Sequence, residues 1–453
     1  MKKIFIVFGL SVASSLWASA QEDVYPTPNE KKHYFITGGT IHVGNGTVIN
    51  NGSIEVIDGK IAKIGENLTI PSGVTVIDAK GKQVYPGLIL PVTDLGLKEI
   101  GGGAVRGSND FREIGDYNPN IRSIVAYNSD SKIINTLKSN GILLAGVAPE
   151  GGTIKGSSTV VQLDAWNWED AAYKMDNVMH MELPSLMNRG GGGRRGGGGG
   201  FPGGPNAAGG GAPVDPLKAA MDRIENLKEF LRQARAYNLE ATHKETNLKY
   251  AAMKGLFDKS QKVFMHANEV RQMMVAIEIA KEFNLDMTIV GASESWQIAD
   301  ILKQNNISVI LNNQHALPSS EDDDIDQPFK TPAILQKAGV VFALNDNDET
   351  TRYRNLPFNA GTAASYGLGK ELALQAITLN AAKIMGVADK TGSLEVGKDA
   401  NLLVTEGDIL DMKTSVIERA MIQGREVDLN NKQKQLNDRY EYKYDLKKKP
   451  KPF

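Results

Sequence analysis

Residues 34–44 read YFITGGTIHVG, residues 53–65 read SIEVIDGKIAKIG, and residues 74–87 read VTVIDAKGKQVYPG. Apolar and polar residues alternate in these runs between Gly-containing turns, which is typical of β-strands. Asp58-Gly59 separates two of the runs and favours a tight hairpin there. A second stretch of this kind, SLEVGKDANLLVTEG at 393–407 and RAMIQGREVDL at 419–429, lies near the other end of the chain. The two ends are therefore expected to form one small β domain together.

The middle of the chain alternates short apolar runs with helical patterns, which predicts βα units around a parallel sheet. The candidate strands are 88–90, 142–148, 159–163, 263–265, 288–290, 309–311 and 340–344. One helix is predicted over 217–234, with Asp215 as its cap and Pro216 as its first residue. Seven or eight such units close into a (β/α)₈ TIM barrel, where chemistry gathers at the C-terminal ends of the strands.

The composition is that of a folded globular chain. Of 453 residues, 41% are hydrophobic and 23% are charged, and 51 Lys and Arg against 53 Asp and Glu give a net charge of −2. This balance excludes a disordered acidic chain and gives no reason to expect nucleic-acid binding. Cysteine is absent, which excludes disulfides, thiolate metal sites and a Cys nucleophile.

The start of the chain has the pattern of a secretory signal. Lys2 and Lys3 precede a mostly apolar run, and Ala18-Ser19-Ala20 is a small-residue cleavage site. We therefore expect export to the periplasm or the extracellular space, with a mature chain that begins at Gln21. No later stretch approaches the roughly 20 apolar residues of a transmembrane helix.

Six histidines and several carboxylates are candidates for chemistry. His266 ends the apolar run 263–265, and His315 follows 309–311, so both are expected at the open face of a barrel. Asp346 and Asp348 follow the run 340–344 at the same face, where an acid serves as general base, metal ligand or helix cap. His180 and His243 are expected in or beside the helical region around the Gly-rich insert, where a functional role is not favoured.

The segments 39–65, 76–89 and 392–408, with IQGREV at 422–427 and ITLNAAKIMGV at 377–387, resemble the amidohydrolase superfamily, in particular its imidazolonepropionase-like members. The resemblance runs from about Tyr34 to Leu429. It implies a metal-dependent TIM barrel with a β-sandwich domain made from both chain ends, in agreement with the pattern of the residues.

The sequence departs from this family at the metal site. The resemblance implies a His-x-His pair after the first barrel strand, but the segment reads PGLILPVTD, with Val92 and Asp94 at the two histidine positions. The strand-five histidine is matched by His266. The strand-six histidine would fall near 289–291, where there is none, and the strand-eight aspartate is matched by Asp346, with Asp348 as the other candidate.

The predicted organisation has five parts, of which one is made from two segments of the chain and another contains an insert. They are a signal peptide (1–20), an N-terminal linker (21–33), a composite β-sandwich domain (34–85 plus 391–429), an amidohydrolase-like barrel (86–390) with a flexible Gly-rich insert (190–211), and a basic C-terminal tail (430–453).

Two functions follow from the resemblance and from the altered site. The first is an exported hydrolase that cleaves C–N bonds of cyclic amides or small peptides with metal-activated water. His266, Asp94 and Asp346 would then hold one divalent metal, zinc above others, and Asp346 or Asp348 would move the proton. The alternative is a catalytically degenerate barrel, with or without a metal, that binds a ligand or pairs with a copy of itself or with a paralogous amidohydrolase.

Overall fold

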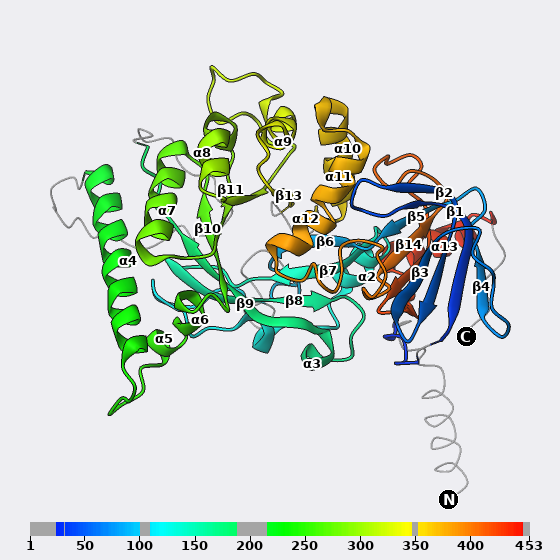
Figure 1. The fold of residues 1–453 in the computed structure, drawn as a ribbon, viewed down its shortest axis with the longest axis horizontal. Coiled ribbons are helices and arrows are strands. Elements are labelled where there is room, and N and C mark those ends of the chain that lie inside the picture. Colours follow the sequence, from blue (N-terminus) through cyan, green and yellow to red (C-terminus); the bar gives the residue numbers. More distant parts are fainter. Residues whose placement is uncertain (1–23, 31, 100–108, 188–214, 347–351, 447–453) are drawn as a thin grey trace, which may run out of the picture.

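The computed structural model describes residues 24–30, 32–99, 109–187, 215–346 and 352–446 (Figure 1). The predicted signal peptide, the Gly-rich insert 190–211 and Asp348 lie outside the described residues. The described residues form two eight-stranded sheets. As predicted, strands from the two ends of the chain form one sheet, and strands from the middle of the chain form the other. In Figure 1 the first sheet lies at one end of the long axis, and the long helix α4 (Pro216–Leu239) lies at the opposite end.

The first sheet combines the two ends of the chain. Its strand order is β16-β15-β14-β5-β1-β2-β3, and β4 pairs with β1. The strands are β1 (Tyr34–His42), β2 (Val48–Ile57), β3 (Lys60–Glu66), β4 (Thr75–Asp78), β5 (Gln83–Pro86), β14 (Leu402–Thr405), β15 (Ile417–Ile422) and β16 (Arg425–Glu426). Asp58 and Gly59 join β2 to β3 with positive φ angles of 50° and 82°, as the predicted hairpin turn requires. Leu402 and Met421 of the C-terminal strands share one apolar core with Ile36 and Ile54 of the N-terminal strands.

The second sheet is the predicted barrel, with strand order β13-β12-β11-β10-β9-β8-β7-β6. Its strands are β6 (Leu88–Thr93), β7 (Ile142–Val147), β8 (Ile154–Gln162), β9 (Ala172–Glu182), β10 (Lys262–Ala267), β11 (Met287–Gly291), β12 (Ser308–Leu311) and β13 (Phe342–Leu344). Neighbouring strands are parallel except around β8, which runs antiparallel to both β7 and β9. The links on both sides of β8 are too short for a parallel crossover, which explains this one departure from regular βα units.

Helices cover the barrel between its strands. The helices after α4 are α5 (Leu248–Ala251), α6 (Lys254–Phe257), α7 (Val270–Phe283), η3 (Ser295–Ile298), α8 (Ala299–Gln304), α9 (Gln327–Ala338), η4 (Tyr353–Asn355), α10 (Leu356–Ala363), η5 (Ala364–Leu368), α11 (Lys370–Ala376) and α12 (Leu379–Ile384). Before α4 lie η2 (Ser123–Ala126), α2 (Lys132–Lys138) and α3 (Trp168–Ala171). Asp215 accepts a hydrogen bond from the Leu217 amide, which confirms it as the cap of α4.

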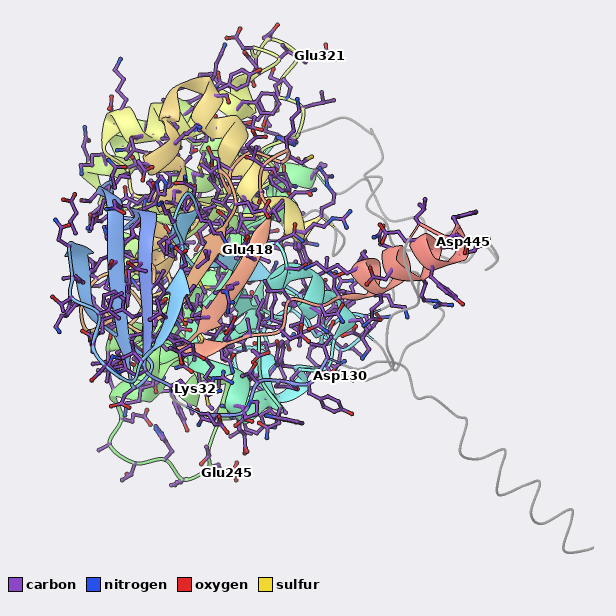
Figure 2. The ribbon with its side chains drawn as sticks, turned by 90° about the vertical axis from the view of Figure 1, so that its right-hand side faces the viewer. Lys32, Asp130, Glu245, Glu321, Glu418 and Asp445 are labelled. Atoms are coloured by element: carbon purple, nitrogen blue, oxygen red, sulfur yellow. The ribbon has the colours of Figure 1, made fainter. Side chains whose placement is uncertain are left out.

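The described part of the C-terminal tail forms helix α13 (Lys432–Lys443), which buries none of its side chains. Figure 2 shows this helix standing out from the body of the protein, with Asp445 near its outer end. In the part of the chain that the structure describes, no helix combines the length and apolarity that a membrane span needs.

Candidate functional site at the mouth of the barrel

The barrel is joined at its seam, between β6 and β13, by one buried side chain. The Asn345 side chain accepts a hydrogen bond from the Val92 amide (3.1 Å) and donates one to the Val92 carbonyl (3.0 Å). It also donates to the Asn312 side chain (2.9 Å) at the end of β12. A single carboxamide therefore takes the place of a strand ladder between the first and last barrel strands.

Val92 is a core residue. All six residues of β6 are buried, and the Val92 side chain, 2% exposed, packs within the apolar core of the barrel. An isopropyl group offers no ligand atom to a metal ion. The backbone of Val92 is also occupied, because both of its polar groups bond to Asn345.

Asp94 follows β6 and is held by other side chains. One of its carboxylate oxygens accepts a hydrogen bond from the hydroxyl of the buried Tyr353, and the other lies 3.9 Å from Nζ of Lys98. These contacts fix Asp94 as an acceptor within the wall of the barrel.

His266 lies at the C-terminal end of β10, one residue before its last residue, and its neighbour is His180, a residue whose functional role we did not favour. Nε2 of His266 lies 3.1 Å from Nδ1 of His180, and Nε2 of His180 lies 2.8 Å from Oγ of Ser158. Contrary to our expectation of helical surroundings, His180 lies in strand β9, on the β9–β10 ladder, and its ring meets the edge of Phe264 at 5.3 Å. The short buried run at 178–181, apolar except for His180, was the signal for this strand.

Both imidazoles are neutral at physiological pH. Burial, followed by the charge of Lys155, lowers the pKa of His180 to about 3. Burial, Lys155 and His180 lower the pKa of His266 well below its ordinary value. Lys155 is itself buried and lies 2.9 Å from Glu182 and 3.6 Å from Glu150. In a neutral pair one ring nitrogen donates to the other, so this contact occupies a nitrogen of each ring.

The resemblance places a histidine near 289–291 at the end of β11, where the chain instead has the buried Ile289 and Val290, followed by Gly291. Gly291 has a φ of 98°, a conformation that residues with a Cβ rarely adopt. A Cβ at this position would also lie 2.5 Å from Oδ1 of Asn268. The local backbone and its neighbour therefore both exclude a simple ligand side chain at the strand-six position.

Asp346 is the one carboxylate here with a free atom. It is 2% exposed, its Oδ2 accepts a hydrogen bond from Asn359 (2.9 Å), and its Oδ1 has no partner. Burial raises the pKa of Asp346, against opposing effects of Asn359, Arg352 and His315. His315 itself lies at the surface, 2.8 Å from Oγ1 of Thr362.

These residues do not fit the metal that the fold family implies. A catalytic zinc site takes three protein ligands that converge on one point. Here one expected ligand is valine, another is glycine, and the remaining candidates bond to Tyr353, His180 and Asn359. Among the described residues, no group of three His, Asp or Glu side chains is placed to hold an ion. The ligand set of His266, Asp94 and Asp346 stays a prediction that this geometry does not support.

A pocket of about 240 Å³ lies beside these residues, at the ends of β10, β11 and β12. Asn268, Gly291 and Asn312 come from the three strand ends, and the N-terminus of α9 closes the opposite side with Gln327. Asn312 links the pocket to the seam through its hydrogen bond from Asn345. The mouth of the barrel is therefore hollowed on its β10–β12 side.

Comparison with known proteins agrees with this architecture. The sequence model of the "Amidohydrolase family" matches residues 331–432. An amidohydrolase from Thermotoga maritima MSB8 has a similar structure, with a TM-score of 0.73 and 23% identity over 87% of this chain and 99% of that one. A Xaa-Pro dipeptidase with bound methionine (TM-score 0.51, 14% identity, 87% and 100% covered) and an adenosine deaminase from Xanthomonas campestris with bound zinc (0.52, 13%, 92% and 99%) share the fold. No curated protein sequence matches the chain significantly.

The fold is a barrel of eight strands with a β-sheet domain built from both chain ends, and solved amidohydrolase structures share it. The matched segment and the shared fold confirm the predicted resemblance to the amidohydrolase superfamily.

Proposed function

We propose that this chain is a catalytically degenerate amidohydrolase, which keeps the scaffold of a hydrolase and uses its barrel mouth to bind a small molecule. The proposal rests on the residues found where the family has its metal ligands. Val92 is packed in the core, Gly291 has no side chain, and His266 is bonded to a second neutral histidine.

Metal-activated water needs an ion that lowers the pKa of water to about 7. Among the described residues, no three His, Asp or Glu side chains converge to hold such an ion. The chain offers no described substitute of comparable strength. A neutral imidazole pair held by Ser158 has no free carboxylate partner to make it a strong base. Function at the mouth is then better explained by recognition than by hydrolysis.

The second candidate is the predicted hydrolase acting on C–N bonds of cyclic amides or small peptides. Asp346 favours it, because a buried carboxyl with one free oxygen and a raised pKa is typical of a general acid or base. The dipeptidase fold relative is consistent with a peptide substrate. Asp348, the other proton carrier that we predicted, lies outside the described residues.

Hydrolysis assays distinguish the two candidates. The purified chain is incubated with zinc or manganese and with Xaa-Pro dipeptides and small lactams, beside the variants His266→Ala and His243→Ala. His243 is a matched histidine on Tyr237, away from the mouth. We expect equal, background release from all three proteins. Turnover that His266→Ala removes and His243→Ala keeps would refute the proposal.

We also propose that the protein is exported, from the signal-like residues 1–20. Pairing with a second copy or with an active paralogous amidohydrolase is compatible with a binding role and is measured by the mass of the native assembly. Mass spectrometry of the mature protein is expected to find Gln21 at its N-terminus, and an intact Met1 would contradict export by this route.

A further inference from the structure

The pocket at the ends of β10, β11 and β12 is lined mainly by neutral polar side chains. Asn268, Asn312, Asn313, Gln314 and Gln327 all contribute carboxamides. Trp296, Leu317 and two prolines add apolar surface. An apolar wall with a few convergent polar groups is typical of a small-molecule site, and at about 240 Å³ this pocket is slightly smaller than the usual range of roughly 300–1,000 Å³.

Two carboxamide oxygens at this pocket have no hydrogen-bond partner. They are Oδ1 of Asn313 and Oε1 of Gln314, and the Gln314 residue is only 3% exposed. A buried acceptor without a donor costs about 1–3 kcal/mol, so native proteins rarely leave one unmatched without a reason. Both oxygens belong to adjacent residues of one loop, and both of these residues line the pocket.

The charges at the pocket restrict what can bind. Its described lining holds no Lys, Arg or His, and Asp323 is its one ionisable residue. An anionic group would lose its hydration without gaining a cation, which is strongly unfavourable. A ligand that supplies N–H or O–H donors and an apolar body matches both the free acceptors and the apolar wall.

We propose that this pocket binds an uncharged small molecule, an inference that rests on the proposed binding function. The ligand donates hydrogen bonds from an amide N–H₂, or a similar pair of donors, to Asn313 and Gln314. Its apolar part packs against Trp296 and Leu317. The pocket selects against the carboxylate of the same shape, since Asp323 and the two carboxamide oxygens all repel negative charge.

Benzamide and benzoate are a matched probe pair, because they differ in the donor group and the charge but share size and ring. Binding to the full-length protein is measured by ligand-observed NMR and calorimetry. We expect benzamide to bind and benzoate to bind at least about tenfold more weakly. Equal binding of the two, or no binding of benzamide at millimolar concentration, would overturn the proposal.

Two variants locate the binding at this pocket. Gln314→Leu removes an unpaired buried oxygen at similar size, so it should keep the melting temperature or raise it while weakening benzamide about tenfold. Asn313→Gly removes the second carboxamide and suits the positive φ of 54° at that position. Gln297→Leu, an exposed carboxamide of η3 outside the pocket, is the control and should change nothing.

Benzamide affinity that Gln314→Leu and Asn313→Gly leave unchanged would overturn the assignment. The test is independent of the hydrolysis assay. A chain that hydrolyses peptides but also binds benzamide at Gln314 would refute the degenerate-enzyme proposal and leave the pocket assignment standing.

Discussion

At the scale of single residues, each described candidate ligand at the mouth of the barrel already contacts another side chain: Asp94 contacts Tyr353, His266 contacts His180 and Asp346 contacts Asn359. The sequence alone shows that Val92 and Gly291 have no side chain that can bind a metal ion, because residue identity determines this. The partners of the remaining candidates were not readable. Tyr353 reaches Asp94 from 259 residues away, and His180 reaches His266 from 86 residues away. Such pairing follows from the barrel closing, which no local pattern reports.

The neutral histidine pair gives a pH-dependent stability. The unfolded His180 binds a proton near pH 6.5, whereas the folded one does so only near pH 3, so the unfolded state gains protons first as the pH falls. This residue alone should remove about 2 kcal/mol of unfolding free energy between pH 7 and pH 5. Urea unfolding of wild type and His180→Gln at both pH values measures it. Parallel losses in the two proteins would contradict the assignment.

The end of β11 is fixed by backbone conformation. We expect Gly291→Ala to cost about 1–2 kcal/mol, because alanine is strained at a φ of 98°. Adding Asn268→Ala removes the 2.5 Å contact but not the strain, so it should recover less than half of the loss. Thermal unfolding of the two single variants and the double variant tests this, and a full recovery would show that Asn268 alone excludes a side chain.

At the scale of elements, local patterns predicted what they control. The hairpin at Asp58-Gly59, the cap at Asp215 and seven of the eight barrel strands follow from turn chemistry, capping and apolar runs. Strand β9 was missed because its N-terminal half mixes apolar with charged residues and is half-buried or exposed. The antiparallel direction of β8 was also not predictable, since an apolar run has no direction.

The seam between β6 and β13 depends on Asn345. Asn345→Ala would leave the Val92 amide and carbonyl unpaired in the core, and we expect a loss of about 3 kcal/mol of unfolding free energy. Asn312→Ala removes only the third partner and should cost about 1 kcal/mol. Denaturant unfolding measures both. Equal costs would mean that the seam is held by packing and not by the carboxamide.

At the scale of the whole molecule, distant parts of the chain meet at one buried charge. Asp164, fully buried, lies 2.8 Å from Nζ of Lys138 and 3.6 Å from Nη1 of Arg425 in β16, and it accepts the amide of Thr27 at 2.9 Å. The same arginine donates to the Thr27 carbonyl at 2.9 Å. The N-terminal segment, the barrel and the C-terminal strands are therefore tied at Asp164, although the chain has no disulfide.

Asp164→Asn should destabilise the whole fold by about 3–5 kcal/mol, because two buried cations lose their counter-charge. Asp130→Asn, which removes an exposed ion pair to Lys132, is the control and should cost at most about 0.5 kcal/mol. Calorimetry is expected to show one shifted transition for Asp164→Asn. A variant that melts at the wild-type temperature would exclude Asp164 as the link.

The central claim is that the barrel mouth has lost its ion site, and metal stoichiometry tests it most directly. The purified chain is equilibrated with zinc, freed of loose ions by gel filtration and measured by plasma mass spectrometry beside His266→Ala. We predict far less than one zinc per chain in both proteins. One or more tightly held ions that disappear in His266→Ala would contradict the account.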